Sequence, residues 1–501
     1  MPPNVLLVLT DQERHDLTAP DGPHVRTPNV DRIAGEGMRF DRAYTPIGIC
    51  SSARASLLSG LYPHAHGMLN NCHDPDAILE NFPEEIPTFG EVLAENGYRN
   101  SYAGKWHVGR DQTPADFGFE YLGGGDGAHA AADEDFFDHQ REHGVDPESI
   151  ELTDAIYHEN NPDKPICATA EIPVEATRAY YIAEKTIDRL EALDAADEPF
   201  FHRTDFVGPH HPYVVPEPYA SMYDPDEIEP WASFAETFEG KPRVQENYRR
   251  YRGVDHLSWD EWAEAISNYF GFMTLIDDQL GRILDAAEGI ENLVVVKTAD
   301  HGDFAGGHRL FNKGPMMYEA TYRIPLAIRW PGVVEPGSTC DAPVSLLDLM
   351  PTFLDLAGTS APEPVHGRSI RPLLEGRRPD DWPDAVFAQY HGDEFGLYSQ
   401  RMLRTERYKY VYNVPDVDEL YDLREDPHEL DNRIDAPDYE SVRAALRERL
   451  VARMESTGDP NAVWARQALL DGDRPTDGGN AEDTRRDLPD DTLSDAKTGD
   501  T

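Results

Sequence analysis

The sequence predicts an α/β protein with a large, mostly parallel sheet flanked by helices and a smaller C-terminal α+β domain. Two observations carry this prediction. Short apolar runs rich in β-branched residues, at 5–9 and 293–298, are typical of parallel strands buried on both faces. These runs alternate with helical segments, which is the pattern of strands joined by crossover helices.

The N-terminal part of the chain alternates between predicted strands and helices. The first strand is followed by a helix with Pro28 at its first position, and a later helix enters at Cys50 and ends at Gly60, a usual terminator. In order, these strands and helices occupy residues 5–9, 27–36, 50–60, 88–95 and 98–103. We expect residues 110–172, which are rich in Gly, Asp and His, to form an irregular insertion.

The remaining elements divide the chain into three parts. In the large domain we expect a helix over 174–193, a strand over 200–206, a helix over 259–287 and a strand over 293–298. Three short strands and an amphipathic helix follow, at 385–390, 401–405, 408–411 and 439–454. We therefore predict a large domain over 1–380, a C-terminal antiparallel-sheet subdomain over 381–468 and a disordered acidic tail over 469–501.

The charge balance of the chain is strongly acidic. Its 501 residues carry a formal net charge of −49, from 94 acidic and 45 basic residues, and only eight of the basic residues are lysine. Such a surface suits concentrated salt, where self-repulsion is screened, so we expect a halophilic source. The sequence offers no basic face, so we expect no nucleic-acid partner.

The spacing of the cysteines tests for a zinc module or disulfides, and the length of the apolar runs tests for a signal peptide or a membrane span. The four cysteines, at 50, 72, 167 and 340, form no C-x-x-C pair, so we expect neither a zinc module nor a disulfide framework. The run at 5–9 is too short for a signal peptide, and no later run approaches the roughly 20 apolar residues of a membrane span. We expect a cytoplasmic protein without a membrane partner.

The helix that enters at Cys50 carries the first candidate site. Its N-terminus, with unpaired N–H groups and the positive end of the helix dipole, favours negative charge. Arg54 lies one turn along the same face. Together these residues are typical of a site for an anionic substrate. The alternative is a buried small side chain at Cys50 beside a surface arginine.

Polar residues also follow several predicted strands, where ligands bind in open α/β sheets. Singly, each has an ordinary explanation: a carboxylate can be a helix cap, a histidine can belong to a loop and a lysine can lie on the surface. The segments are Asp11-Gln12, Lys105-Trp106-His107, His210, Asp300-His301 and, further on, Lys313.

As an ordered set, these segments resemble the motifs of the sulfatase family. The resemblance covers most of residues 4–455 and includes the small-domain strand at 418–423. The matching segments are Asp11-Gln12, Cys50-Ser51-Ser52-Ala53-Arg54, Gly104-Lys105-Trp106-His107, Pro209-His210-His211-Pro212, Asp300-His301-Gly302-Asp303 and Lys313-Gly314-Pro315. In that family the cysteine is oxidised to formylglycine.

The resemblance implies an alkaline-phosphatase-like fold and the metal-dependent hydrolysis of sulfate monoesters, with residues 1–380 as the catalytic domain. A maturation enzyme would convert Cys50 into the formylglycine nucleophile. One divalent cation, Ca²⁺ by family default, would be held by Asp11, Gln12, Cys50, Asp300 and His301. Because an imidazole ligand moves the preference towards transition ions, Mn²⁺ or a similar ion is an alternative.

The resemblance also implies roles for the remaining motif residues. Arg54 would hold the converted side chain, and His107 would take its proton. Lys105 and Lys313 would bind sulfate oxygens. His210, aided by Lys313, would protonate the leaving alcohol.

Two other functions stay open at this point. Phosphonate monoester or phosphodiester hydrolases share the scaffold, and Asp-Gln followed later by Asp-His occurs in that branch too. The chain also has Ser52 where the family motif has Pro or Ala, so a non-catalytic protein that binds sulfated ligands is the second alternative. The sequence leaves open the oligomeric state and the alcohol, which could belong to choline sulfate, an aryl sulfate or a sugar sulfate.

Overall fold

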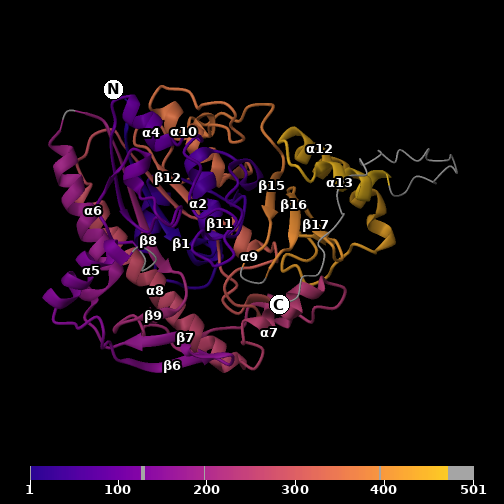
Figure 1. Ribbon diagram of the computed structural model, residues 1–501, viewed down its shortest axis with the longest axis horizontal. Coiled ribbons are helices and arrows are strands. Elements are labelled where there is room, and N and C mark those ends of the chain that lie inside the picture. Colours follow the sequence, from indigo (N-terminus) through magenta and orange to yellow (C-terminus); the bar gives the residue numbers. More distant parts are fainter. Residues whose placement is uncertain (1, 126–129, 197, 394–395, 472–501) are drawn as a thin grey trace, which may run out of the picture.

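The computed structural model describes residues 2–125, 130–196, 198–393 and 396–471. Within these ranges, eight strands form one sheet in the order β13-β2-β12-β10-β1-β8-β4-β5. Figure 1 labels β12, β1 and β8 of this sheet. In that order they span Ser338–Cys340, Met38–Phe40, Leu326–Arg329, Leu293–Ala299, Asn4–Asp11, Phe200–Pro209, Arg99–Gly104 and Glu120–Tyr121. The run from β10 to β5 is parallel, and β12 is antiparallel to both of its neighbours. The predicted mostly parallel sheet is confirmed.

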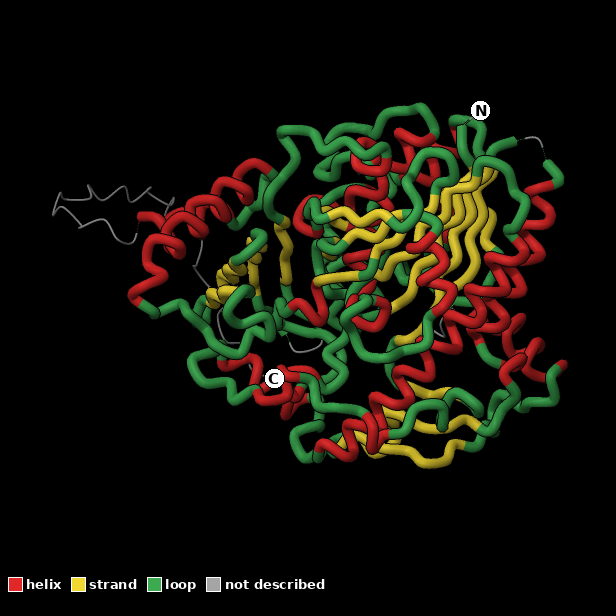
Figure 2. Tube along the Cα trace, turned by 180° about the vertical axis from the view of Figure 1, so that it is seen from behind, coloured by secondary structure: helices red, strands yellow, loops and turns green. Residues whose placement is uncertain are grey.

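Helices cover both faces of this sheet, which Figure 2 shows as a twisted layer of strands between helices. Successive strand residues point to opposite faces. On β1, Val5, Leu7 and Leu9 pack with α2, α4 and α10, whereas Leu6 and Val8 pack with α1, α6 and α8. In chain order, these six helices are α1 Pro28–Gly35, α2 Cys50–Ser59, α4 Phe89–Glu95, α6 Arg178–Asp194, α8 Trp259–Ala286 and α10 Leu349–Leu356. Burial on both faces explains the continuous apolar run of β1.

Local signals place most helix ends close to their predicted positions. α2 ends at Gly60, whose φ of 69° lies in the left-handed region that glycine tolerates. α6 begins at Arg178 rather than at 174, because the side-chain oxygen of Thr177 caps it by accepting from the Tyr180 N–H. Further helices are α3 Pro63–His66, α7 Arg243–Tyr251, α9 Glu319–Tyr322 and α11 Arg371–Leu374. A small sheet joins β11 Arg323–Ile324, β3 Ala43–Tyr44 and β14 Val344–Ser345.

The expectation of an irregular insertion over 110–172 is wrong. This segment contains α5 Ala130–Glu142 and the hairpin of β6 Leu152–His158 with β7 Asn161–Ala170. The first half of β7 is exposed and includes two prolines, so it has no alternating pattern that predicts a strand. Its second half is buried and pairs with β9 Tyr213–Val215, a contact that local sequence does not encode.

The C-terminal part confirms the predicted smaller α+β domain. Its antiparallel sheet consists of β15 Val386–Tyr390, β16 Ser399–Arg404, β17 Tyr408–Val414 and β18 Glu419–Asp422. Two helices, α12 Glu440–Ser456 and α13 Ala462–Arg466, complete its core. The boundaries at 380/381 and 468/469 stay predictions, and the predicted disordered tail lies outside the described residues from 472 onward.

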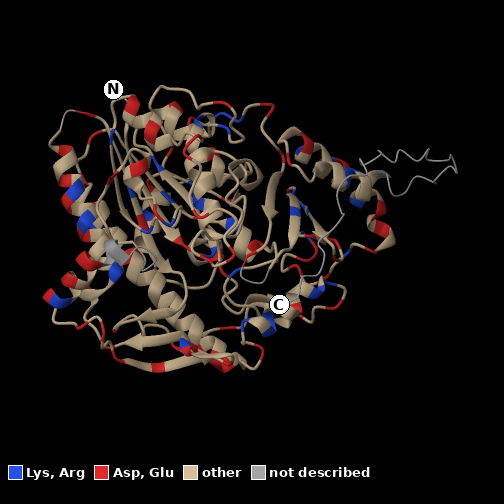
Figure 3. Ribbon diagram, in the orientation of Figure 1, with Lys and Arg blue, Asp and Glu red and all other residues tan. Residues whose placement is uncertain are grey.

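Charged residues are spread widely along the outer helices and loops, where acidic residues are frequent (Figure 3). This distribution agrees with the net charge of −49. In the described ranges, no helix has both the length and the apolar character needed to cross a membrane.

Candidate active site

The carboxyl ends of four parallel strands meet at one edge of the large sheet. Asp11 is the last residue of β1, Asp300 directly follows β10, Asp205 lies on β8 and Lys105 directly follows β4. Gly104 precedes Lys105, and a Cβ atom there would lie 1.9 Å from the carbonyl oxygen of Asp205. Only glycine therefore lets β4 approach β8 this closely.

Helix α2 brings Cys50 to this edge from the loop side. The Cys50 Sγ atom is fully buried, 3.2 Å from His301 Nε2 and 3.7 Å from Asp11 Oδ1. Burial and the neighbouring Asp11 raise the pKa of the Cys50 thiol to about 12. At neutral pH the unmodified side chain is therefore a protonated thiol and a weak nucleophile.

Arg54 binds the carboxylates of three separate strands. Its Nε atom lies 2.9 Å from Asp300, one terminal nitrogen lies 2.9 Å from Asp11, and the other lies 2.7 Å from Asp205 and donates to the Lys105 carbonyl. The guanidinium and all three carboxylates are fully buried. In this arrangement Arg54 fixes the positions of the acidic groups around Cys50.

Two lysines add positive charge to the same group. Lys105 Nζ lies 3.0 Å from Asp11 Oδ2, and Lys313 Nζ lies 3.1 Å from Gln12 Oε1. Burial alone would lower the pKa of Lys313, but attraction to neighbouring acidic groups, Asp11 among them, outweighs it and raises this pKa. Lys313 is therefore a buried ammonium at neutral pH.

His210 is paired with Lys313. Its Nδ1 atom lies 2.6 Å from the His211 carbonyl oxygen, which can only accept, so Nδ1 carries the proton. The lone pair of Nε2 then faces Lys313 Nζ at 3.3 Å. Burial and Lys313 hold the pKa of His210 well below its usual range, so the ring is neutral.

The donor set around Cys50 fits a divalent cation. The donor atoms of Asp11, Cys50, Asp300 and His301 all lie within 4.8 Å of one another, and all four residues are buried. His301 Nδ1 donates to the Gly302 carbonyl, so its Nε2 lone pair is directed to the group. Burial and Asp11 raise the pKa of Asp300 to about 7, which reflects two neighbouring carboxyls that a cation would neutralise.

Comparison with known proteins identifies the family. The family model described as sulfatase matches residues 3–359, and the model for the C-terminal part of N-sulphoglucosamine sulphohydrolase matches residues 306–456.

This chain belongs to the sulfatase family.

The relatives of this sulfatase align over nearly its whole length. It is 31% identical to an uncharacterized sulfatase, YidJ, from Escherichia coli, over 91% of this chain and 88% of that protein. It is 30% identical to an arylsulfatase from Clostridium perfringens, over 91% of this chain and 95% of the other. A crystal structure of a phosphonate monoester hydrolase from Agrobacterium radiobacter superposes with a TM-score of 0.75 at 25% identity, covering 91% and 96%. The predicted enzyme class, a sulfuric ester hydrolase, is confirmed by the family model and by the arylsulfatase relative.

The fold gathers most of the residues that the sequence singled out, with two qualifications. Gln12 donates its backbone N–H to Asp300, but its side chain binds Asp303 and Lys313. The ring of His107 lies 4.9 Å from that of His73, and His107 is not part of the donor group around Cys50. A ligand role for Gln12 and a base role for His107 therefore stay predictions.

Two buried carboxylates of the site were not among the predicted site residues. Asp205 binds Arg54, Arg203 and the Tyr102 hydroxyl, and it lies within the buried strand β8. The sequence signal was there: a charged residue inside a strand buried on both faces needs a partner. Asp303 accepts hydrogen bonds from Gln12 and from the Tyr213 hydroxyl, and the sequence singles it out only as part of the motif at 300–303.

Proposed function

We propose that this sulfatase hydrolyses sulfate monoesters at the buried group formed by Asp11, Cys50, Asp300 and His301. The observation that carries the proposal is the position of Cys50, at the N-terminus of α2 and within 4.8 Å of the other three donors. A sulfate ester is an anion, and a site for it needs fixed positive charge and helix N–H groups.

The proposed reaction needs two groups that the unmodified chain does not supply: a divalent cation and formylglycine. A divalent cation held by Asp11, Asp300, His301 and residue 50, with Gln12 as a further predicted ligand, would neutralise the charge of the anionic substrate. Ca²⁺ is the family default, and the imidazole of His301 favours Mn²⁺ or a similar ion. Formylglycine made from Cys50 would supply an oxygen nucleophile in place of the thiol, whose pKa of about 12 makes it a poor one.

The chain's own residues would bind the sulfate group and move the protons. Lys105 and Lys313 would bind non-bridging sulfate oxygens as buried ammonium groups. Because His210 is neutral with its Nε2 lone pair towards Lys313, the proton for the leaving alcohol would come from Lys313, directly or through His210. Arg54 would keep the three carboxylates in place, and His107 remains the predicted proton acceptor.

A cavity beside His210 indicates which kind of alcohol the substrate carries. His210 and His211 line a cavity of about 450 Å³ whose other walls are largely apolar, with Leu152, Ile172 and Phe272 among them. We propose that the alcohol portion of the substrate enters this cavity. An apolar wall favours aryl or alkyl sulfates over highly hydroxylated sugar sulfates.

Hydrolysis of phosphonate monoesters or phosphodiesters is the second candidate. The solved phosphonate monoester hydrolase from Agrobacterium radiobacter supports it as a relative of the same architecture. Values of kcat/KM for an aryl sulfate, an aryl phosphonate monoester and an aryl phosphodiester, measured in high salt, decide between the two. Faster hydrolysis of the sulfate is expected, and a preference for either phosphorus ester would overturn the proposal.

Conversion of Cys50 is tested separately. The peptide that contains residue 50 should be about 18 Da lighter than its sequence mass when the chain is produced with a maturation enzyme. The Cys50→Ala variant should fold and be inactive. An unshifted peptide from matured, inactive protein that still binds sulfated ligands would favour the non-catalytic alternative, in which Ser52 prevents conversion. The cytoplasmic location and the halophilic source stay predictions.

A further inference from the structure

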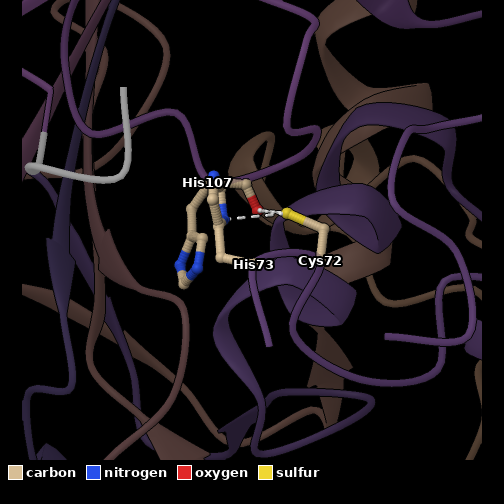
Figure 4. Close-up of side chains that lie close together, drawn as sticks. All are labelled: Cys72, His73 and His107. Carbon is tan, nitrogen blue, oxygen red and sulfur yellow. Dashed lines mark hydrogen bonds between the residues drawn. The ribbon is translucent and has the colours of Figure 1, made fainter. Parts of the chain in front are cut away.

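A second group of side chains that could hold a metal ion lies apart from the group around Cys50. Cys72, His73 and His107 each offer one donor atom, and these three atoms lie within 4.8 Å of one another. Figure 4 shows the Cys72 thiol directed to the His73 ring and to the His107 carbonyl oxygen, with the two imidazole rings side by side. The Cys72 Sγ atom lies 3.1 Å from His73 Nδ1, and the ring centroids of His73 and His107 are 4.9 Å apart.

The loops that carry these residues are held in place by hydrogen bonds. The Cys72 backbone N–H donates to Ser51 Oγ at 3.2 Å, which ties this loop to the first turn of α2. Arg110 donates to the carbonyl oxygens of Cys72 and Asp74 at 2.7 and 2.6 Å, so it links the loop around Cys72 to the segment that contains His107. The donor atoms are therefore positioned before any ion binds, which reduces the ordering cost of binding.

The chemistry of the donors favours a soft or borderline cation. A thiolate and two imidazoles suit Zn²⁺, Co²⁺ or Cu⁺, whereas Ca²⁺ prefers oxygen ligands. In a tetrahedral zinc site a sulfur and a nitrogen ligand are separated by roughly 3.5 Å, close to the separation of Cys72 and His73. Three protein ligands leave one position for water or another ligand.

We propose that Cys72, His73 and His107 form a binding site for one Zn²⁺-like ion, distinct from the divalent-cation site at Cys50. Cys72 is fully buried, while His73 and His107 are partly exposed, so an ion can enter from the side of the two histidines. On binding, the Cys72 S–H bond is replaced by a sulfur–metal bond and the proton is released to solvent.

The site also has a consequence for hydrolysis, and this part rests on the proposed function. If His107 accepts a proton during turnover, an ion bound to its ring nitrogen occupies the lone pair that the reaction needs. Zn²⁺ would then inhibit the enzyme reversibly without displacing the cation at Cys50.

Binding is tested with full-length Cys50→Ser protein in excess Ca²⁺, which removes the other site's thiol and fills its oxygen ligands. Titration with Co²⁺ should give a near-ultraviolet thiolate-to-cobalt absorption band that saturates at one equivalent and is displaced by Zn²⁺. Adding Cys72→Ser should abolish the band and weaken Zn²⁺ binding by at least about 100-fold. Adding Cys340→Ser, which removes a half-buried thiol elsewhere, should leave the band unchanged.

If Cys72→Ser does not fold, His73→Asn serves as the second variant, and it should weaken Zn²⁺ binding while altering the cobalt spectrum. No thiolate band in the Cys50→Ser protein, or a band that persists after Cys72→Ser, would overturn the site. Activity is tested with the matured enzyme. Zn²⁺ should inhibit it, dialysis into Zn²⁺-free buffer that contains excess Ca²⁺ should reverse this, and Cys72→Ser should be active and resistant. Cobalt binding without sulfatase activity would refute the proposed function alone.

Discussion

The Nε atom of Arg54 lies 2.9 Å from Oδ2 of Asp300, and both side chains are fully buried. These residues are 246 positions apart in the chain. The contact joins the first turns of α2 to the residues that follow β10, so a buried ion pair links the segment that carries Cys50 to the segment that carries His301.

Replacement of Arg54 by alanine should destabilise the protein strongly. The change leaves the carboxylates of Asp11, Asp205 and Asp300 without their shared buried cation, which typically costs about 3–5 kcal/mol. Urea unfolding measures the loss. Arg377→Ala, which removes an exposed arginine, should change stability by less than about 0.5 kcal/mol. Equal stability of both variants would contradict a structural role for the Arg54 contacts.

Removal of divalent cations should lower both stability and activity. A cation that binds only the folded state stabilises it by about 2.7 kcal/mol at 100 times its Kd. Dialysis against a chelator, followed by thermal unfolding with and without added Ca²⁺ or Mn²⁺, measures this effect. Asp300→Asn should need more cation for the same gain, whereas Asp285→Asn, at an exposed position, should behave like the unaltered protein. An identical response of both variants would argue against Asp300 as a ligand.

The loss of activity on removing His210 should depend on the leaving group. A nitrophenolate leaves without a proton, but an alkoxide does not, so proton transfer matters only for alkyl sulfates. His210→Ala and Lys313→Ala should lower kcat/KM by about 100-fold or more for an alkyl sulfate, and His210→Ala by much less for nitrophenyl sulfate. His256→Ala, at a partly exposed histidine, is the control. Equal losses of His210→Ala on both substrates would rule out a role for His210 in proton transfer to the leaving alcohol.

His202 should make the folded state sensitive to acid. It is fully buried between Ser101 and Thr186, and burial lowers its pKa to about 3, against about 6.5 when unfolded. The unfolded state therefore binds more protons, and the stability contributed by the neutral ring is complete above pH 6.5 and is lost as the pH falls towards 3.

The measurement compares unfolding free energies of the unaltered protein and His202→Gln between pH 7 and 4. Below about pH 6.5, the difference between them should shrink by up to about 1.4 kcal/mol per pH unit, since the variant lacks the titrating ring. Parallel curves would show that His202 does not titrate in this way.

Salt should stabilise the protein. At a net charge of −49, repulsion between exposed carboxylates opposes the folded state, and the Debye length falls from about 10 Å at 0.1 M salt to about 3 Å at 1 M. The melting temperature should rise over this range of KCl. Neutralising exposed carboxylates, as in Asp285→Asn with Asp381→Asn, should reduce the salt dependence. A melting temperature that is independent of salt would contradict adaptation to concentrated salt.

Strands and helices with a strong local pattern could be predicted from the sequence, while weak ones could not. β1 and β10 are buried on both faces, so each is a continuous apolar run that stands out. β7 is buried along only half its length, and what makes it a strand is its pairing with β6 and β9. Its local sequence therefore resembled a loop.

Site residues that follow a strand could be predicted from the sequence. A site carboxylate that lies inside a strand could not. Asp11 and Asp300 occupy strand ends, where ligands bind in α/β sheets. Asp205 lies within β8, and its partner Arg54 is 151 positions away. The spacing of the cysteines predicted no zinc module. The fold nevertheless brings His107 next to Cys72 and His73, which the spacing of cysteines alone does not reveal.

The sequence by itself determined the architecture, the order of the catalytic motifs and the acidic surface, because each depends on residue type, periodicity or spacing within a short window. Only the tertiary structure decided which charges share a site: the three carboxylates bound by Arg54, the neutral His210 beside Lys313, and the thiol and imidazoles at Cys72. The reason is physical. The protonation state and ligand geometry of a side chain depend on burial and on atoms a few ångströms away, and folding brings those atoms from distant parts of the chain.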